Sequence, residues 1–287
     1  MDDNMATQAL ILGEERSTEI IDFVLRESAA DAMEVVVQGE NTNLTRFTGL
    51  AIHQNVIENT RRLLLRSVWD GRVVRVGTDD FSKESIRRAL QRSEKLAAKV
   101  SPDVTVPKFE YALESQSEHD LVTFNLATAN CGPKERAHIV EEACGVFRRC
   151  GVNGAGNVRV HLSELAVGNS MGLRRYAPFS IIALVVVALD EANNSSGYQN
   201  WIGRDIERMD TDAMAHEVSM KCLLGRLPKI IEAEPMTVVL EPPAVAQLLF
   251  HLNFRSLGVF GAKAASRSES IIFENMGERI TSQKISI

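Results

Sequence analysis

The sequence has 287 residues, of which 45% are hydrophobic and 24% charged, and its formal net charge at pH 7 is −6. This composition is typical of a globular chain that can bury one or two cores, and it excludes disordered and fibrous proteins. The acidic balance argues against direct binding to nucleic acid, which usually leaves a basic footprint. Arginine pairs such as Arg87-Arg88 are interpreted as solvated faces.

The sequence carries no recognisable targeting or membrane signal. No N-terminal stretch combines a basic start, an apolar block and a small-residue cleavage site. The longest apolar run, 181–189, is too short to cross a bilayer. The four cysteines show no CxxC spacing, so we expect free thiols that act as packing residues. The chain is predicted to be cytoplasmic and to have no contact with a membrane.

The first hundred residues predict a helix followed by antiparallel strands. Helical periodicity covers 14–27. A β-branched run at 32–38 predicts a short strand that ends at Gly39, and extended patterns follow over 52–56 and 60–68.

A hairpin and a second helix complete this segment. Asp70-Gly71, between β-forming residues, is the pair that a type I′ turn favours, because both positions need a positive φ. The helix is predicted over about 82–98, with Ser82 as its N-cap.

After a proline-containing stretch at 99–118, the order of helix, strand, turn and strand starts again. A helix is predicted over 135–150 and strands over 157–166 and 174–189. The glycines of CGVNGAGNV (150–158) are interpreted as a helix C-cap and turn. A dinucleotide loop would instead follow a strand and open a helix. The two halves are therefore expected to share a similar order of elements.

The last third adds a helix over about 210–224, a buried strand over 237–240 and a helix that begins at Pro242-Pro243. The buried stripe of the first of these helices is predicted to comprise Met214, Val218 and Cys222.

The predicted fold class is α+β. It comprises an N-terminal helix and antiparallel-sheet domain (14–100), a middle α/β domain (101–230) and the beginning of a β-rich C-terminal domain (231–287).

His216-Glu217 has the appearance of half a zinc-protease motif. Such a motif needs a second His one helical turn later, so that both imidazoles face one ion. Met220 and Lys221 occupy the candidate positions. His216 also lies about 200° around the helix from the buried Met214, so we interpret it as a surface residue.

Other catalytic arrangements are absent from the sequence. There is no GxSxG elbow, no Walker or Rossmann loop, and no recognisable cysteine–histidine arrangement. The paired carboxylates Asp79-Asp80 and Glu141-Glu142 are interpreted as surface charge on a turn and a solvated helix. An independent activity of another kind is therefore the weakest hypothesis.

Several segments together resemble one protein family. TRFTGLAIHQNVIENTRRLLLRSVWDGRVVRVGTDDFSKESI is similar to the N-terminal signature of the TldD/PmbA family, the modulators of DNA gyrase. NSMG, SSGYQNWIGRDIERMD, TVVLEPPAVAQLL and SIIFENMGERITS resemble later landmarks of that family in the same order. The resemblance runs from about Ser17 to the last residue, and its specificity lies in the ordered set.

The resemblance implies a cytoplasmic protein that forms dimers. Its catalytic member is implied to be a zinc peptidase acting on unfolded peptides, with an HExxxH helix directly after the segment that corresponds to TVVLEPP and a cysteine ligand further on. Here the first His would fall on Phe250, the Glu on His251 and the second His on Arg255. None of these three suits its role, because Phe cannot bind zinc, His cannot replace the carboxylate, and Arg keeps its proton.

The resemblance also implies that family chains continue well past ITSQKISI, so the sequence is expected to be a shortened member or a fragment. We predict no catalytic, cofactor-binding or metal-ligating residues and no cofactor. The first hypothesis is a non-catalytic partner or substrate-holding subunit, in a homo- or heterodimer with an HExxxH-carrying paralogue. The alternative is a stand-alone peptide- or protein-binding module, or an inactive fragment of a longer protein.

Overall fold

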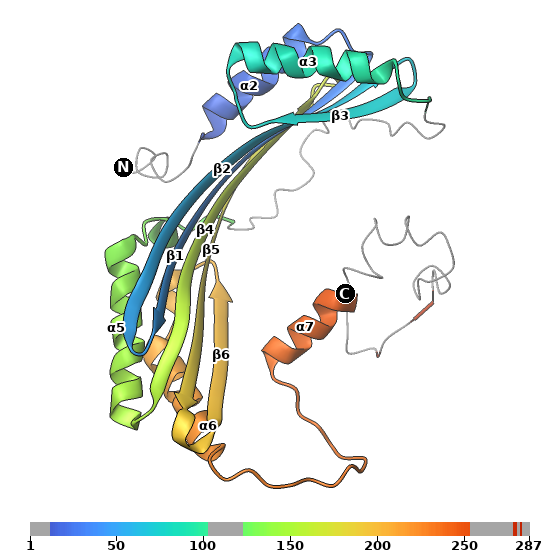
Figure 1. Ribbon diagram of the computed structural model, residues 1–287. Coiled ribbons are helices and arrows are strands. Elements are labelled where there is room, and N and C mark those ends of the chain that lie inside the picture. Colours follow the sequence, from blue (N-terminus) through green and yellow to red (C-terminus); the bar gives the residue numbers. More distant parts are fainter. Residues whose placement is uncertain (1–11, 103–122, 253–277, 280–281, 283–287) are drawn as a thin grey trace. The chain divides into compact units, whose positions relative to one another are not determined.

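The computed structural model describes residues 12–102, 123–252, 278–279 and 282. The chain divides into two units between Leu227 and Pro228, and each is described by itself. The first unit is built on a six-stranded antiparallel sheet in the order β3-β2-β1-β4-β5-β6 (Figure 1). The α+β class is confirmed. In the described part of the chain, no helix is both long and apolar enough to cross a membrane.

The two halves of the first unit have the same order of elements, which confirms the similarity predicted from the sequence. Each half runs helix, three strands, helix, and the halves meet where β1 pairs with β4. The segments expected as N-terminal and middle domains therefore each supply three strands of one continuous sheet. The first half comprises α2 (Glu14–Glu27), β1 (Ala32–Thr48), β2 (Ala51–Trp69), β3 (Arg72–Thr78) and α3 (Lys83–Ala97).

The second half follows a short helix, α4 (Leu126–Ala129). It comprises α5 (Pro133–Cys150), β4 (Asn153–Asn169), β5 (Arg174–Asp190), β6 (Ser195–Gly203) and α6 (Thr211–Leu224). Two 3-10 turns, Glu191–Asn193 and Ile206–Arg208, flank β6. Strand β6 was not predicted from the sequence.

Strand β1 is much longer than predicted, because Gly39 does not end it. Gly39 pairs with Arg61 on β2 and with Glu164 on β4. A Cβ at this position would lie 2.6 Å from Oε1 of Glu164, so the missing side chain leaves room for that carboxylate. The glycine therefore marks a close approach within a strand, which is one of the known uses of glycine in sheets.

The predicted hairpin and its following helix are confirmed. Asp70 and Gly71 have φ values of 47° and 72°, as a type I′ turn requires. Ser82 caps α3 by accepting a hydrogen bond from the Ser85 backbone N–H at 3.2 Å.

The glycine-rich segment after α5 is only partly a turn. Gly151 ends α5 in the left-handed conformation, with a φ of 66°, which confirms the predicted C-cap. Gly154 and Gly156 already belong to β4 and are not part of a turn. A Cβ on Gly154 would lie 2.2 Å from the ring of Phe147, so α5 packs closely against the strand because the glycine has no side chain.

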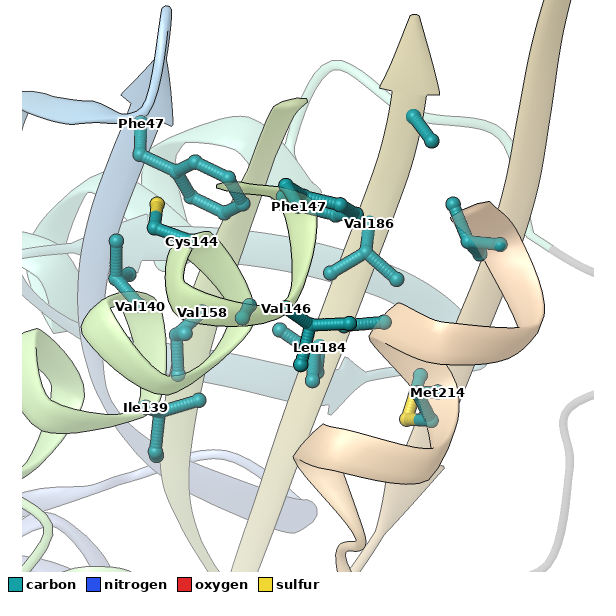
Figure 2. Close-up of a cluster of buried hydrophobic side chains, with 14 of the residues drawn as sticks. Phe47, Ile139, Val140, Cys144, Val146, Phe147, Val158, Leu184, Val186 and Met214 are labelled. Carbon is teal, nitrogen blue, oxygen red and sulfur yellow. The ribbon is translucent and has the colours of Figure 1, made fainter. Parts of the chain in front are cut away.

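Two hydrophobic cores lie at opposite ends of one face of the sheet. Alternate residues of β1 point to this face, so that Val35 belongs to the first core and Phe47 to the second. The second core lies between β4, β5 and the helices α5 and α6, and Figure 2 shows its packing. The predicted stripe of α6 is confirmed. Its members are all buried in this core: Met214, Val218 and Cys222.

The second unit contains α7 (Pro242–Leu252), which begins at the predicted proline pair. The strand predicted over 237–240 is wrong. These residues form neither helix nor strand, and Val239 is 89% exposed. A short apolar segment becomes a strand only when another strand pairs with it, and none of the described residues does so. Most of 253–287, where the sequence predicts the beginning of a β-rich domain, lies outside the described residues.

Candidate functional site

His216 and Glu217 lie on the exposed side of α6, as the helical spacing predicts. Glu217 forms an ion pair with Lys221 at 2.8 Å and accepts a hydrogen bond from Gln199 at 2.9 Å. These two donors, led by Lys221, hold the pKa of the Glu217 carboxyl below its usual value. The pair therefore forms part of a solvated helix surface.

The positions at which the resemblance implies an HExxxH helix fall at the end of α7. Phe250 and His251 are adjacent and exposed, with their ring centroids 5.7 Å apart in an edge-on arrangement. Arg255 lies outside the described residues. Across the ranges that the structure describes, no three His, Cys, Asp or Glu side chains gather in a geometry that could hold a metal ion. Phe250 offers no ligand atom at the position of the first histidine, and His251 stands at the position of the glutamate, so neither residue fits the HExxxH helix that the resemblance implies.

The outer edge of β2 has a strand neighbour along only part of its length. Strand β3 pairs only with residues 63–69 of β2, whereas β1 pairs with β2 along nearly its whole length. Within the described ranges, residues 51–62 therefore have a strand neighbour on one side only. Ile57 is 56% exposed on this edge. An edge of this kind presents unpaired backbone N–H and C=O groups that can accept another strand.

The sheet face opposite the helices is partly apolar. Along β5, alternate residues point away from the second core, and among these Phe179, Ile181 and Val185 are only half-buried. Ile202 on β6, which pairs with Ala183 of β5, is 64% exposed. The apolar stretch that the sequence shows at 180–189 is thus covered by helices on one face, and the described residues cover the other face only in part.

A buried arginine joins the first turn of α5 to the β1–β2 hairpin. The Arg136 guanidinium donates to Thr45 Oγ1 at 3.0 Å, to the Cys131 carbonyl at 2.9 Å and to Asn55 Oδ1 at 3.1 Å. All three acceptors are neutral, and burial lowers the pKa of the guanidinium. Burial likewise raises the pKa of the neighbouring Cys131 thiol to about 11. These groups lock two elements together, and the thiol is a weak nucleophile.

A buried carboxylate occupies the middle of the sheet, between the two cores. Glu164 accepts hydrogen bonds from the backbone N–H groups of Leu12 and Gly13 at 2.7 and 2.8 Å. Tyr176 donates its hydroxyl to the same carboxylate at 3.1 Å. Burial, reinforced by the charge of Glu164, raises the pKa of Tyr176 above its usual value. Glu164 thereby anchors the N-terminus of α2 to β4.

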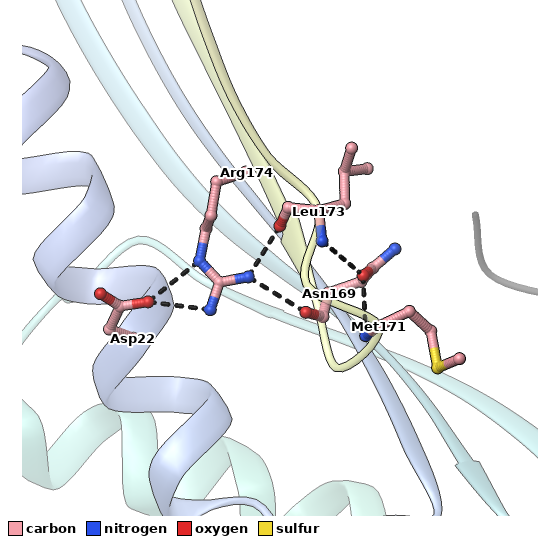
Figure 3. Close-up of polar contacts among 5 residues, drawn as sticks. All are labelled: Asp22, Asn169, Met171, Leu173 and Arg174. Atoms are coloured by element: carbon pink, nitrogen blue, oxygen red, sulfur yellow. Dashed lines mark hydrogen bonds and ion pairs between the residues drawn. The ribbon is translucent and has the colours of Figure 1, made fainter. Parts of the chain in front are cut away.

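The NSMG turn between β4 and β5 is also tied to α2 (Figure 3). Asn169 Oδ1 accepts from the backbone N–H groups of Met171 and Leu173, which closes the turn. Arg174 donates to both turn carbonyls, of Asn169 and Leu173, and to Asp22 on α2 at 2.9 Å. The NSMG turn and Arg174 therefore hold α2 in position against the sheet.

Sequence reasoning missed Arg136 and Glu164, although each left a signal. Glu164 alternates with Leu162 and Ala166 on the inward side of β4, where an isolated carboxylate is out of place. Arg136 lies three and four residues before Ile139 and Val140, on the apolar stripe of α5. A charged residue at a core position predicts a specific buried partner.

No model of a known protein family matches the chain, and no curated protein matches it. Several solved structures share its fold. TldE from Thermococcus kodakarensis has a TM-score of 0.60 at 16% identity, over 72% of this chain and 47% of that one. A protein described as a proposed modulator of a DNA gyrase from Thermotoga maritima has a TM-score of 0.59 at 12% identity, over 73% and 47%.

A third structure covers more of the chain. A proposed modulator of DNA gyrase from Bacteroides thetaiotaomicron has a TM-score of 0.76 at 12% identity, over 95% of this chain and 63% of that one. The chain thus spans between about half and under two thirds of the length of these proteins. The fold that the sequence resemblance implied is the fold observed.

Proposed function

We propose that the chain is a cytoplasmic member of the TldD/PmbA family without a zinc site of its own, and that it holds unfolded peptide as the partner subunit of a zinc metallopeptidase. The observation that carries this proposal is the open edge of β2 over residues 51–62. Backbone hydrogen bonds are the same for every sequence, so a strand edge can hold an unfolded chain with little sequence preference.

The residues at the positions aligned with the zinc helix support a non-catalytic role for this chain. Phe250 offers no ligand atom, and His251 stands where the general base would be needed. Water activation by zinc would have to come from an HExxxH-carrying partner. We therefore expect a heterodimer in which this chain contributes binding surface and the partner contributes the chemistry.

The holding role can be tested with a fluorescently labelled, unstructured peptide and the full 287-residue chain. We expect saturable binding by fluorescence anisotropy, and loss of binding when alternate peptide nitrogens are N-methylated, because methylation removes the donors that pair with an edge strand. Ile57→Lys should weaken binding at least about tenfold, since a lysine on the edge disfavours strand pairing. The matched control is Ile202→Lys, on the opposite edge of the sheet.

Equal weakening by the two lysine variants would contradict a site at the β2 edge. Full binding of the N-methylated peptide would contradict strand addition altogether. Thermal unfolding followed by circular dichroism identifies any variant that binds poorly only because it is unfolded.

The partnership is tested by co-purification from the source cell, with mass spectrometry of the associated proteins. The proposal expects an HExxxH-carrying relative, and peptide cleavage that needs both chains and stops on addition of a chelator. Peptide binding by a solitary chain would instead favour the stand-alone binding module. That alternative draws support from the first unit, which has two hydrophobic cores of its own.

A further inference from the structure

A groove of about 420 Å³ lies between α2 and α3, on the helix layer of the first half of the sheet. Its apolar lining includes Ile20, Phe23, Phe81 and Ile86. Phe23 is only 7% exposed, although it lies at the surface end of its core. Long cationic side chains cover its ring and account for this burial.

Three cations converge on the ring of Phe23. The guanidinium carbons of Arg26 and Arg87 lie 5.6 and 5.3 Å from the ring centroid, and Lys83 Nζ lies 5.6 Å from it. Each contact is favourable, because the ring face carries partial negative charge. The three positive charges also repel one another, so the cluster is costly without nearby negative charge.

The nearby carboxylates neutralise only part of this cluster. Glu27 accepts from Arg87 Nε at 2.8 Å, and this hydrogen bond, followed by the charges of Arg87, Arg26 and Lys83, holds the pKa of Glu27 below its usual value. Glu84 also acts electrostatically on Arg87. Within the described residues, neither Arg26 nor Lys83 has a carboxylate at ion-pair distance.

The two acidic residues that line the groove already have ion-pair partners, Glu19 with Arg16 inside the groove and Asp22 with Arg174 outside it. Asp22 binds Arg174 at 2.9 Å, and Glu19 binds Arg16 at 2.7 Å. The two unpaired cations therefore lie beside apolar surface in a groove, on a chain whose net charge is −6. This local reversal of charge, together with the apolar lining, suits a ligand that is both anionic and apolar.

We propose that this groove binds an acidic segment of a protein partner, with two carboxylates on Arg26 and Lys83 and a neighbouring apolar side chain, on the same side of the segment, against the lining. In an extended peptide, side chains two residues apart lie on the order of 7 Å from each other on one side. Both cations lie within 5.6 Å of the same ring, so two such carboxylates can reach both. The inference does not rest on the proposed function, because it uses α2 and α3 and not the edge of β2.

The test uses the full chain and fluorescein-labelled peptides in which two glutamates, or in the control two lysines, are spaced two residues apart and are followed two residues later by a leucine on the same side. We expect the glutamate peptide to bind in a salt-sensitive manner and the lysine peptide not to bind. The double variant Arg26→Glu with Lys83→Glu should lower the affinity at least about tenfold. The matched control, Arg75→Glu with Arg88→Glu, changes the net charge equally at exposed positions outside the groove, and should stay within about twofold of the wild type.

An equal loss of peptide affinity in both double variants would contradict the groove as the binding site, because it would indicate attraction to the overall charge of the chain. If the lysine peptide bound as tightly as the glutamate peptide, charge complementarity would not explain the binding. Displacement by millimolar inorganic phosphate would overturn the peptide as ligand and indicate a small-anion site. If charge reversal prevents folding, Arg26→Gln with Lys83→Gln removes both charges with less repulsion, and the same affinity loss is expected.

Discussion

The two halves of the sheet share one order of elements but close their helix layers differently. In the second half, α5 and α6 pack against each other, and Phe147 is fully buried between helix and sheet. In the first half, α2 and α3 make few contacts with each other, and a groove rimmed with cations separates them. A repeated topology therefore does not impose repeated packing: the closed layer contributes core, and the open layer presents charge.

The largest expected effect is a loss of stability in the closed helix layer of the second half. Phe147→Ala should lower the free energy of unfolding by about 3–5 kcal/mol, because the cavity is enclosed by a helix and a strand that cannot collapse into it. Phe23→Ala should cost about 2 kcal/mol or less, since the groove beside its ring can be filled by water and by the flexible cations. Urea unfolding followed by circular dichroism measures both. Equal losses would contradict the contrast between the layers.

A smaller effect is expected at the junction of the halves. Glu164→Ala removes the acceptor of three hydrogen bonds and leaves the N–H groups of Leu12 and Gly13 without it, at a cost of about 1.5–3 kcal/mol. Proteolysis should then cleave first near the start of α2. The control Glu58→Ala, an exposed carboxylate on β2, should change stability by less than about 0.5 kcal/mol. Unchanged protection of α2 would argue against an anchoring role.

The smallest expected effect concerns the thiols. Cys150 is only partly buried, whereas Cys131, Cys144 and Cys222 are buried, so iodoacetamide at pH 8 should label Cys150 first, as mass spectrometry can establish. Burial raises the pKa of Cys131 from 9.0 to about 11, so the folded state keeps this proton longer than the unfolded state. The stability from this thiol is complete below pH 9 and is lost as the pH rises towards 11. Early labelling of Cys131 would mean that the second half opens more readily than its packing suggests.

Local patterns predicted much of the secondary structure. The helix at 14–27 and the cap at Ser82 depend on residues within one or two turns, and so does the Asp70-Gly71 hairpin. The exposure of His216 followed from helical spacing alone. The same reasoning failed at Gly39 and over 237–240. Whether a glycine interrupts a strand depends on the neighbouring strands, and whether an apolar run becomes a strand depends on a partner.

The sequence by itself determined the periodicities, the turns and the incompatibility of Phe250 with a zinc ligand, because these depend on residue type and short spacing. Only the tertiary structure decided that two α-β-β-β-α halves share one sheet. It also decided that the outer edge of β2 over 51–62, about 40 Å long at the usual strand rise, has no strand neighbour among the described residues. It also decided that Arg26, Lys83 and Arg87 meet over Phe23, although the sequence presents Arg87-Arg88 as ordinary surface charge. These features join residues far apart in the chain, and no local pattern encodes such distances.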